Sequence, residues 1–193
     1  MSNEIFETFY YRMMPLFKPQ AEQILTISAP EDFRRVAFRY TFSVEAMTKI
    51  SHIIEDMVIR TPAVADLHVS FQYLSRLLPQ RDRYRRVAQA ARKLWLYGTY
   101  DTPATTLNFL PRAAIIDTSG TTLMQYWFVV AYGPGVGMSL VAEEIPAMTG
   151  AERFYEGFYT FELDVAYQLN LILHQIYPDQ VRRPIPPEQL ENS

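Results

Sequence analysis

The sequence contains no cysteine and only seven glycines. The absence of cysteine excludes disulfides, zinc–thiolate sites, iron–sulfur clusters and thiol nucleophiles. It also excludes a pigment or flavin attached through a cysteine, so any chromophore has to be bound non-covalently. The sequence predicts no cofactor.

Long apolar runs are missing as well. A membrane-spanning helix needs about 20 consecutive apolar residues, and no uncharged apolar stretch approaches that length. The N-terminus lacks the basic region followed by an apolar run that is typical of an export signal. We therefore expect a cytoplasmic protein without membrane insertion.

Positive charge is scarce. The chain has 18 Lys and Arg residues against 21 Asp and Glu, which gives a formal net charge of -3 at pH 7. Binding to nucleic acid requires a basic field that neutralises phosphates. The sequence therefore predicts no nucleic-acid partner.

Catalytic motifs are also absent. The only Gly-rich stretch, residues 133–137, lacks the Lys-Ser/Thr of a phosphate loop and the spacing of a dinucleotide fingerprint, so we interpret it as a turn. The three histidines lie in different predicted elements, and none has the spacing of a metal-ligand motif. Neither a nucleophile elbow nor a kinase signature is present. We expect a protein that is not an enzyme.

What the sequence does contain is apolar and aromatic residues. Of its 193 residues, 49% are hydrophobic and 14% are aromatic, with 13 Tyr and 12 Phe. This is enough for one buried core, so a single domain is expected. The aromatic excess indicates that some rings line a pocket or a contact face.

The two ends of the chain are distinct from its centre. Residues 1–35 form a predicted helical arm rich in Met and aromatic residues, with Pro15 interrupting the helical spacing. This arm either packs on the protein's own core or docks on a partner through its Met and aromatic face. Residues 178–193 form a Pro-rich tail that we expect to be extended, and either mobile or laid along a partner.

Residues 36–177 form the predicted α+β domain, a mainly antiparallel sheet packed against a few helices. A strand is expected at 36–41, then a helix with Ser43 as its N-cap and Glu45 and Lys49 as an i,i+4 pair. A strand at 67–72 precedes a basic helical segment at 76–93, which is either a solvated face or an electropositive surface for an acidic partner or a phosphorylated ligand. Strands at 94–99, 112–117, 123–132, 138–145 and 155–161 then suggest an antiparallel meander before a final helix.

Several segments in order resemble the bacterial DICT sensory domain, which occurs beside diguanylate cyclases and two-component proteins. The resemblance runs from about residue 38 to residue 173. The segments that carry it are 51–56 (SHIIED), 69–72 (VSFQ), 82–86 (DRYRR), 94–97 (LWLY), 126–130 (YWFVV), 139–144 (SLVAEE) and 153–161 (RFYEGFYTF). It implies an α+β fold, a role in bacterial signalling and a link to light responses.

We therefore predict a non-enzymatic sensory input or adaptor domain that acts by binding a protein partner. Two alternatives remain open: a non-covalent carrier of a pigment or other small ligand, and a structural subunit that docks through residues 1–28 and 178–193. The predicted binding residues, expected to line a cleft between helix and sheet, are Glu55, Tyr84, Arg85, Trp95, Trp127, Glu143 and Phe158.

Overall fold

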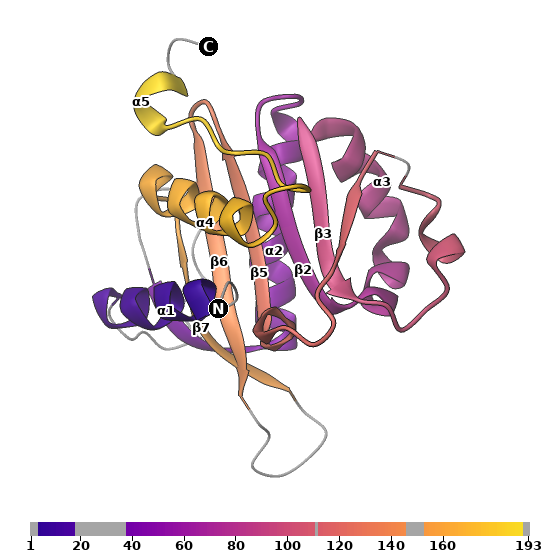
Figure 1. The fold of residues 1–193 in the computed structure, drawn as a ribbon, viewed down its shortest axis with the longest axis horizontal. Coiled ribbons are helices and arrows are strands. Elements are labelled where there is room, and N and C mark those ends of the chain that lie inside the picture. Colours follow the sequence, from indigo (N-terminus) through magenta and orange to yellow (C-terminus); the bar gives the residue numbers. More distant parts are fainter. Residues whose placement is uncertain (1–3, 18–37, 111, 146–152, 191–193) are drawn as a thin grey trace.

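The centre of the structure is a seven-stranded sheet (Figure 1). The computed structural model describes residues 4–17, 38–110, 112–145 and 153–190. The strands are β1 (Phe38–Ser43), β2 (Asp66–Tyr73), β3 (Lys93–Thr99), β4 (Ala114–Asp117), β5 (Tyr126–Gly133), β6 (Val136–Ile145) and β7 (Phe154–Thr160), in the order β1-β7-β6-β5-β2-β3-β4 across the sheet.

The sheet is mixed, and this corrects the predicted meander in part. Strands β5, β6 and β7 form the expected antiparallel meander, and β1 and β2 pair antiparallel to β7 and β5. However, β3 pairs in parallel with both β2 and β4, so β4 lies at the edge of the sheet and not beside β5. The physical reason is the helical connection between β2 and β3, since a parallel pair requires such a crossover.

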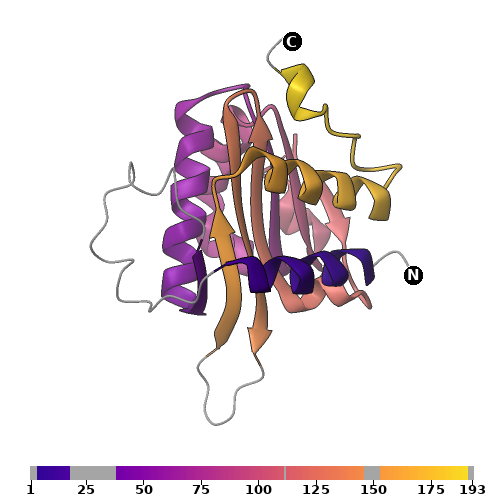
Figure 2. The same cartoon turned by 90° about the vertical axis from the view of Figure 1, so that its left-hand side faces the viewer.

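Helices cover both faces of the sheet (Figure 2). On one face lie α2 (Val44–Arg60) and α3 (Arg81–Ala90), the latter preceded by the 3-10 helix η4 (Leu74–Gln80). We call this the α2 face. On the opposite face, the α4 face, lie α1 (Glu4–Met13) and α4 (Leu163–Ile176). The remaining short helices are η1 (Met14–Leu16), η5 (Ala104–Leu107), η6 (Thr122–Gln125) and α5 (Pro187–Leu190).

Each face has its own hydrophobic core because the central strands are buried on both sides. In β5, Trp127 and Val129 pack on the α2 face, while Tyr126, Phe128 and Val130 pack on the α4 face. This explains why β5, which lies between β6 and β2, reads as a continuous apolar run.

Helix α2 begins as the sequence predicts. The Ser43 hydroxyl accepts a hydrogen bond from the backbone N–H of Ala46 (3.2 Å), which satisfies one of the free donors at the helix start. Lys49 forms the predicted ion pair with Glu45 at 2.8 Å. Because both side chains are largely exposed, this pair adds little stability.

The described part of the N-terminal arm packs on the protein's own sheet. Phe6 and Tyr10 of α1 are fully buried, and the Phe17 ring stacks on that of Phe158 in β7 with centroids 4.6 Å apart. The Met and aromatic positions at the helix spacing therefore serve the core. The rest of the predicted arm, and the first two residues of the strand predicted at 36–41, lie outside the described residues.

The described part of the C-terminal tail, residues 178–190, differs from the expectation of a mobile or partner-bound segment. It lies along the α4 face, where Val181 and Leu190 are buried. The Trp95 indole N–H donates to the Gln180 carbonyl (2.9 Å), and Arg182 pairs with the buried carboxylate of Asp66. Apolar anchors and polar partners supplied by the protein itself explain this placement.

Candidate ligand pocket and basic surface

The predicted binding residues do not line one cleft. Glu55, Tyr84, Arg85 and Trp127 lie on the α2 face, whereas Trp95, Glu143 and Phe158 lie on the α4 face. The expectation of a single cleft is therefore wrong, because strands buried on both sides send neighbouring residues to opposite cores.

The three residues on the α4 face have structural contacts. Trp95 is buried and stacks on His68 with ring centroids 4.4 Å apart. Phe158 lies in the aromatic core beneath α1. The Glu143 carboxylate accepts a hydrogen bond from the hydroxyl of Tyr11 at 2.9 Å, and this bond raises the pKa of Tyr11. These residues hold α1 and the C-terminal tail on the sheet.

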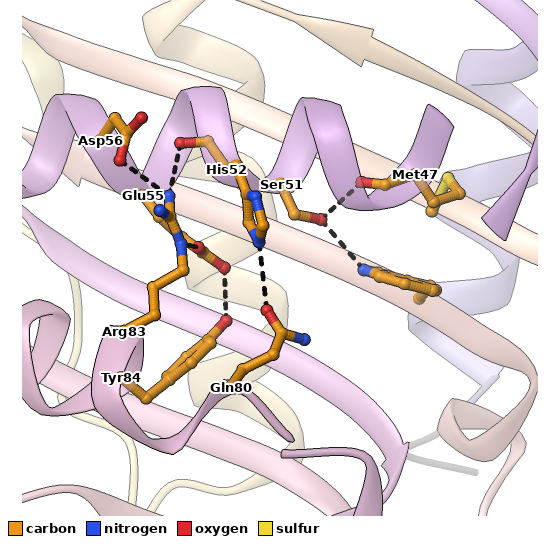
Figure 3. A network of polar contacts seen from close by, with 9 residues as sticks. Met47, Ser51, His52, Glu55, Asp56, Gln80, Arg83 and Tyr84 are labelled. Atoms are coloured by element: carbon orange, nitrogen blue, oxygen red, sulfur yellow. Dashed lines mark hydrogen bonds and ion pairs between the residues drawn. The ribbon is translucent and has the colours of Figure 1, made fainter. Parts of the chain in front are cut away.

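On the α2 face, a buried polar network joins α2 to α3 (Figure 3). The Glu55 carboxylate accepts hydrogen bonds from the Tyr84 hydroxyl (2.5 Å) and from the Arg83 guanidinium. Arg83 also donates to the Asp56 carboxylate (2.8 Å) and to the backbone carbonyl of His52 (2.9 Å). The two helices are thus fixed to each other by charge-assisted bonds.

Burial sets the electrostatics of this network. The Glu55 side chain is only 1% exposed, and burial raises its pKa even though Arg83 and Tyr84 both act to lower it. Burial also raises the pKa of Tyr84 well above its ordinary value, so its hydroxyl remains a donor to Glu55. Glu55 and Tyr84, two of the predicted binding residues, are therefore used in helix packing.

The network reaches the sheet near a small cavity. His52 contacts the Gln80 side chain at 3.1 Å, and the Trp127 indole N–H donates to the Ser51 hydroxyl at 3.2 Å. Gln80 and Trp127 line a cavity of about 230 Å³, which we call the Arg76–Arg153 pocket. Its lining residues are Val44, Thr48, Phe71, Arg76, Pro79, Gln80, Trp127 and Arg153.

A β-bulge shapes the floor of this pocket. The register of β2 against β3 shifts between Ser70 and Gln72, which leaves Phe71 unpaired. Gln72 has a φ of 61°, a left-handed conformation that is rare for a residue other than glycine. The bulge breaks the alternation of side chains, so Phe71 and Gln72 both reach the α2 face. Non-glycine residues held this way are concentrated at functional sites.

The side chain of Gln72 organises the polar groups at this floor. Its amide N–H donates to the Glu144 carboxylate at 2.9 Å. Its carbonyl oxygen accepts from the Tyr155 hydroxyl at 3.0 Å and from the guanidinium of Arg76. Burial, followed by the charge of Glu144, raises the pKa of Tyr155 to about 12, while Arg153 and Arg76 act in the opposite direction.

Both arginines of the pocket lack a carboxylate partner at ion-pair distance among the described residues. Arg76 lies over the Tyr73 ring, 4.9 Å from its centroid. Against the effect of burial, hydrogen bonds from Ser75 and, to a smaller extent, the charge of Arg76 lower the pKa of the exposed Asp101. Arg153 donates to the Tyr155 hydroxyl at 3.3 Å. Two guanidiniums and the Glu144 carboxylate therefore leave a net positive charge at the pocket.

A second basic feature lies on the outer side of α3, and we call it the α3 surface. It consists of the exposed Arg81, Arg85 and Arg112 around the half-buried Phe109, with the exposed Arg86 next to Arg85 along α3. The guanidiniums of Arg81 and Arg85 each lie 5.6 Å from the centroid of the Phe109 ring. A groove of about 430 Å³ runs here, lined by Arg85, Ala88, Gln89, Phe109, Leu110 and Arg112.

Sequence reasoning found part of this arrangement. An electropositive surface was one of the two interpretations of the basic segment at 76–93, and Arg85 and Trp127 were among the predicted binding residues. Gln72 and Arg153 were not among the predicted binding residues, although they lie in the segments 69–72 and 153–161 that carry the family resemblance. A bulge and a contact between residues 83 positions apart bring them to the pocket. Arg76 was noted only as part of the basic segment.

The arrangement suits the binding of anions. Within the described ranges, no group of three or more His, Asp or Glu side chains is placed to hold a metal ion. No helix among the described residues is both long enough and apolar enough to cross a membrane. Guanidiniums beside aromatic rings can bind a carboxylate and an apolar group together.

Comparison with solved structures identifies a similar fold. The crystal structure of polyphosphate kinase from Porphyromonas gingivalis matches with a TM-score of 0.57 and 12% sequence identity. The match covers 88% of this chain but only 30% of the kinase chain. At this identity the likeness concerns the fold alone. No curated protein matches the sequence.

Comparison with protein families confirms the resemblance inferred from the sequence. The model of a family described as the sensory domain in diguanylate cyclases and two-component systems matches residues 34–145. The matched region contains α2, α3, the bulge and the α3 surface. It supports a sensory role in signal transduction. The chain belongs to the DICT family of sensory domains.

Proposed function

We propose that this chain is a non-enzymatic signal-input or adaptor domain whose α3 surface binds an acidic segment of a protein partner. The observation that carries the proposal is the concentration of three exposed arginines, Arg81, Arg85 and Arg112, around one aromatic ring, in a chain whose formal net charge is -3. Such local charge attracts acidic partners and raises their rate of association.

The charges of the α3 surface are available to a partner. Arg83 on the same helix is occupied by Glu55 and Asp56, but Arg81, Arg86 and Arg112 form no ion pair with the described residues. Asp82, which pairs with Arg85 at 2.7 Å, is 85% exposed, so a carboxylate from a partner can replace it at low cost.

Phe109 supplies the apolar part of the surface. It is half-buried, and its ring lies next to two guanidiniums in the groove. Arginine and aromatic residues are enriched at protein interfaces. A partner segment with alternating acidic and apolar residues therefore suits this surface.

If the chain were a structural subunit, it would dock on its partners through the two ends of the chain. The described parts of those ends, residues 4–17 and 178–190, are instead packed on the α4 face through Phe6, Tyr10, Val181 and Leu190. This packing favours the α3 surface as the contact site.

A fluorescently labelled peptide of alternating Glu and Leu tests the proposal by anisotropy at several salt concentrations. The double substitution Arg85→Glu and Arg112→Glu should weaken binding at least tenfold, since two favourable charge contacts become repulsive. Arg60→Glu, at the exposed end of α2, changes charge elsewhere and should have little effect. Equal binding by the double variant, or tighter binding of a single-stranded RNA of equal charge, would overturn the proposal.

The link to light that the family implies belongs to the same proposal, together with the alternative of a non-covalent pigment carrier. An absorption spectrum of protein purified from its native host tests both. Because the chain has no cysteine, a bound pigment should separate from the protein on denaturation. A pigment that stays attached after denaturation would contradict this expectation.

A further inference from the structure

The Arg76–Arg153 pocket has features of a binding site that the packing of the fold does not require. Its two guanidiniums come from segments far apart in the sequence, Arg76 from η4 and Arg153 from the residue just before β7. Neither forms an ion pair with a carboxylate of the described residues, and both line one cavity. Two guanidiniums brought together at one cavity favour an anion.

The bulge in β2 is the second, independent observation. Gln72 is 2% exposed and holds a left-handed backbone while its side chain contacts Arg76, Glu144 and Tyr155. A regular strand would direct this side chain to the α4 face. The strained conformation therefore places Gln72 where it orients the Arg76 guanidinium beside the cavity.

Ring-containing apolar side chains form much of the pocket wall. Phe71 and the half-buried Trp127 both line it, together with Pro79. Thr48 and Gln80 add neutral polar groups. The volume of about 230 Å³ lies below the roughly 300–1,000 Å³ typical of sites for drug-sized ligands, so the ligand is small.

Charge narrows the class of ligand further. The Glu144 carboxylate is fixed near the guanidiniums by Gln72 at 2.9 Å and by the Tyr155 hydroxyl at 3.3 Å. This negative charge offsets one guanidinium and repels a dianion. The pocket is therefore complementary to a single negative charge carried on an apolar body.

We infer that the Arg76–Arg153 pocket binds a small organic carboxylate that carries a planar apolar ring. Arg76 and Arg153 bind its carboxylate, and Phe71 and Trp127 pack against its ring. This site goes beyond the proposed partner binding and uses none of the residues of the α3 surface. It gives the sensory domain an input of its own.

Benzoate is a suitable probe, with tryptophan fluorescence of the full chain as the measurement because Trp127 lines the pocket. Acetate has the charge without the ring, benzyl alcohol has the ring without the charge, and inorganic phosphate has a higher charge without the ring. Benzoate should produce a saturable change in fluorescence, and the other three should bind at least tenfold more weakly.

Substitutions in the pocket test the assignment. Arg76→Gln and Arg153→Gln should each weaken benzoate binding about tenfold or more, the typical effect of losing a charge-assisted hydrogen bond. Arg60→Gln removes a charge from the exposed end of α2 and should bind benzoate like the unmodified protein. If Arg76→Gln fails to fold, Arg153→Gln decides, since its described polar contact is a single bond to Tyr155.

The inference is overturned by any of three results. One is the absence of saturable benzoate binding. Another is an affinity for benzyl alcohol equal to that for benzoate, which would leave the carboxylate without a role, or an equal affinity for phosphate, which would leave the ring without a role. The last is unchanged benzoate affinity in folded Arg153→Gln, which would place binding elsewhere on the protein.

Discussion

Replacing Arg83 by methionine should destabilise the protein strongly, because it leaves the Glu55 carboxylate buried without its counter-ion. Glu55 is 1% exposed and Arg83 is 20% exposed. Breaking a buried ion pair by removing one partner costs about 3–5 kcal/mol. The partial exposure of Arg83 favours the lower end, about 3 kcal/mol, which corresponds to a fall in Tm of about 6–12 °C for a domain of this size.

The loss of stability in Arg83→Met should depend on pH in a defined direction. Without Arg83 the folded-state pKa of Glu55, already raised by burial, rises further. The destabilisation is then fully present above that pKa and shrinks as the pH falls below it, since a protonated Glu55 needs no counter-ion. Urea unfolding at pH 7 and pH 5 should therefore show a smaller loss at pH 5.

A matched control lies two residues away on the same helix. Arg85→Met removes an exposed arginine whose partner, Asp82, is also exposed. It should change the free energy of unfolding by less than about 1 kcal/mol. Equal destabilisation by the two variants, or a loss in Arg83→Met that does not change between pH 5 and pH 7, would refute the structural role assigned to Glu55 and Arg83.

Two further predictions concern the α4 face. Burial lowers the folded-state pKa of His68 to about 3, so below about pH 6.5 the unfolded chain binds a proton that the folded protein does not. The free energy of unfolding should therefore fall by up to about 1.4 kcal/mol per pH unit as the pH drops from about 6.5 toward 5. In urea titrations, His68→Phe should flatten this pH dependence. Removal of residues 178–193 exposes Trp95 and removes the ion pair between Arg182 and Asp66, so Tm should fall by several degrees. An unchanged Tm would mean that the tail does not stabilise the core.

Local signals made part of the fold predictable. The Ser43 cap and the apolar stripe of α2 depend on neighbours within a few residues, and the continuous apolar run of β5 follows directly from burial on both faces. The turn at residues 133–135 likewise places β5 beside β6. These features are encoded near the residues that show them.

The parts that were missed depend on distant contacts. The helical segment predicted between the strands at 67–72 and 94–99 is the crossover that sets β3 parallel to β2, but the expectation of a meander left it unused. Nothing in the connection between β3 and β4 indicates that these strands also pair in parallel. A strand buried on both sides carries no alternation that tells which core receives Trp95 or Phe158. The conformation of Gln72 has no sequence signal, since serine, phenylalanine and glutamine are ordinary strand residues.

The central claim is that the α2 side of the sheet carries two separate anion-binding sites, one for a small carboxylate and one for an acidic protein segment. The direct measurement is the affinity of benzoate and of the Glu-Leu peptide for the same two variants. Arg153→Gln should lose benzoate binding and keep the peptide, while Arg85→Glu with Arg112→Glu should lose the peptide and keep benzoate. Loss of both ligands in either folded variant, or of neither in both, would contradict the account.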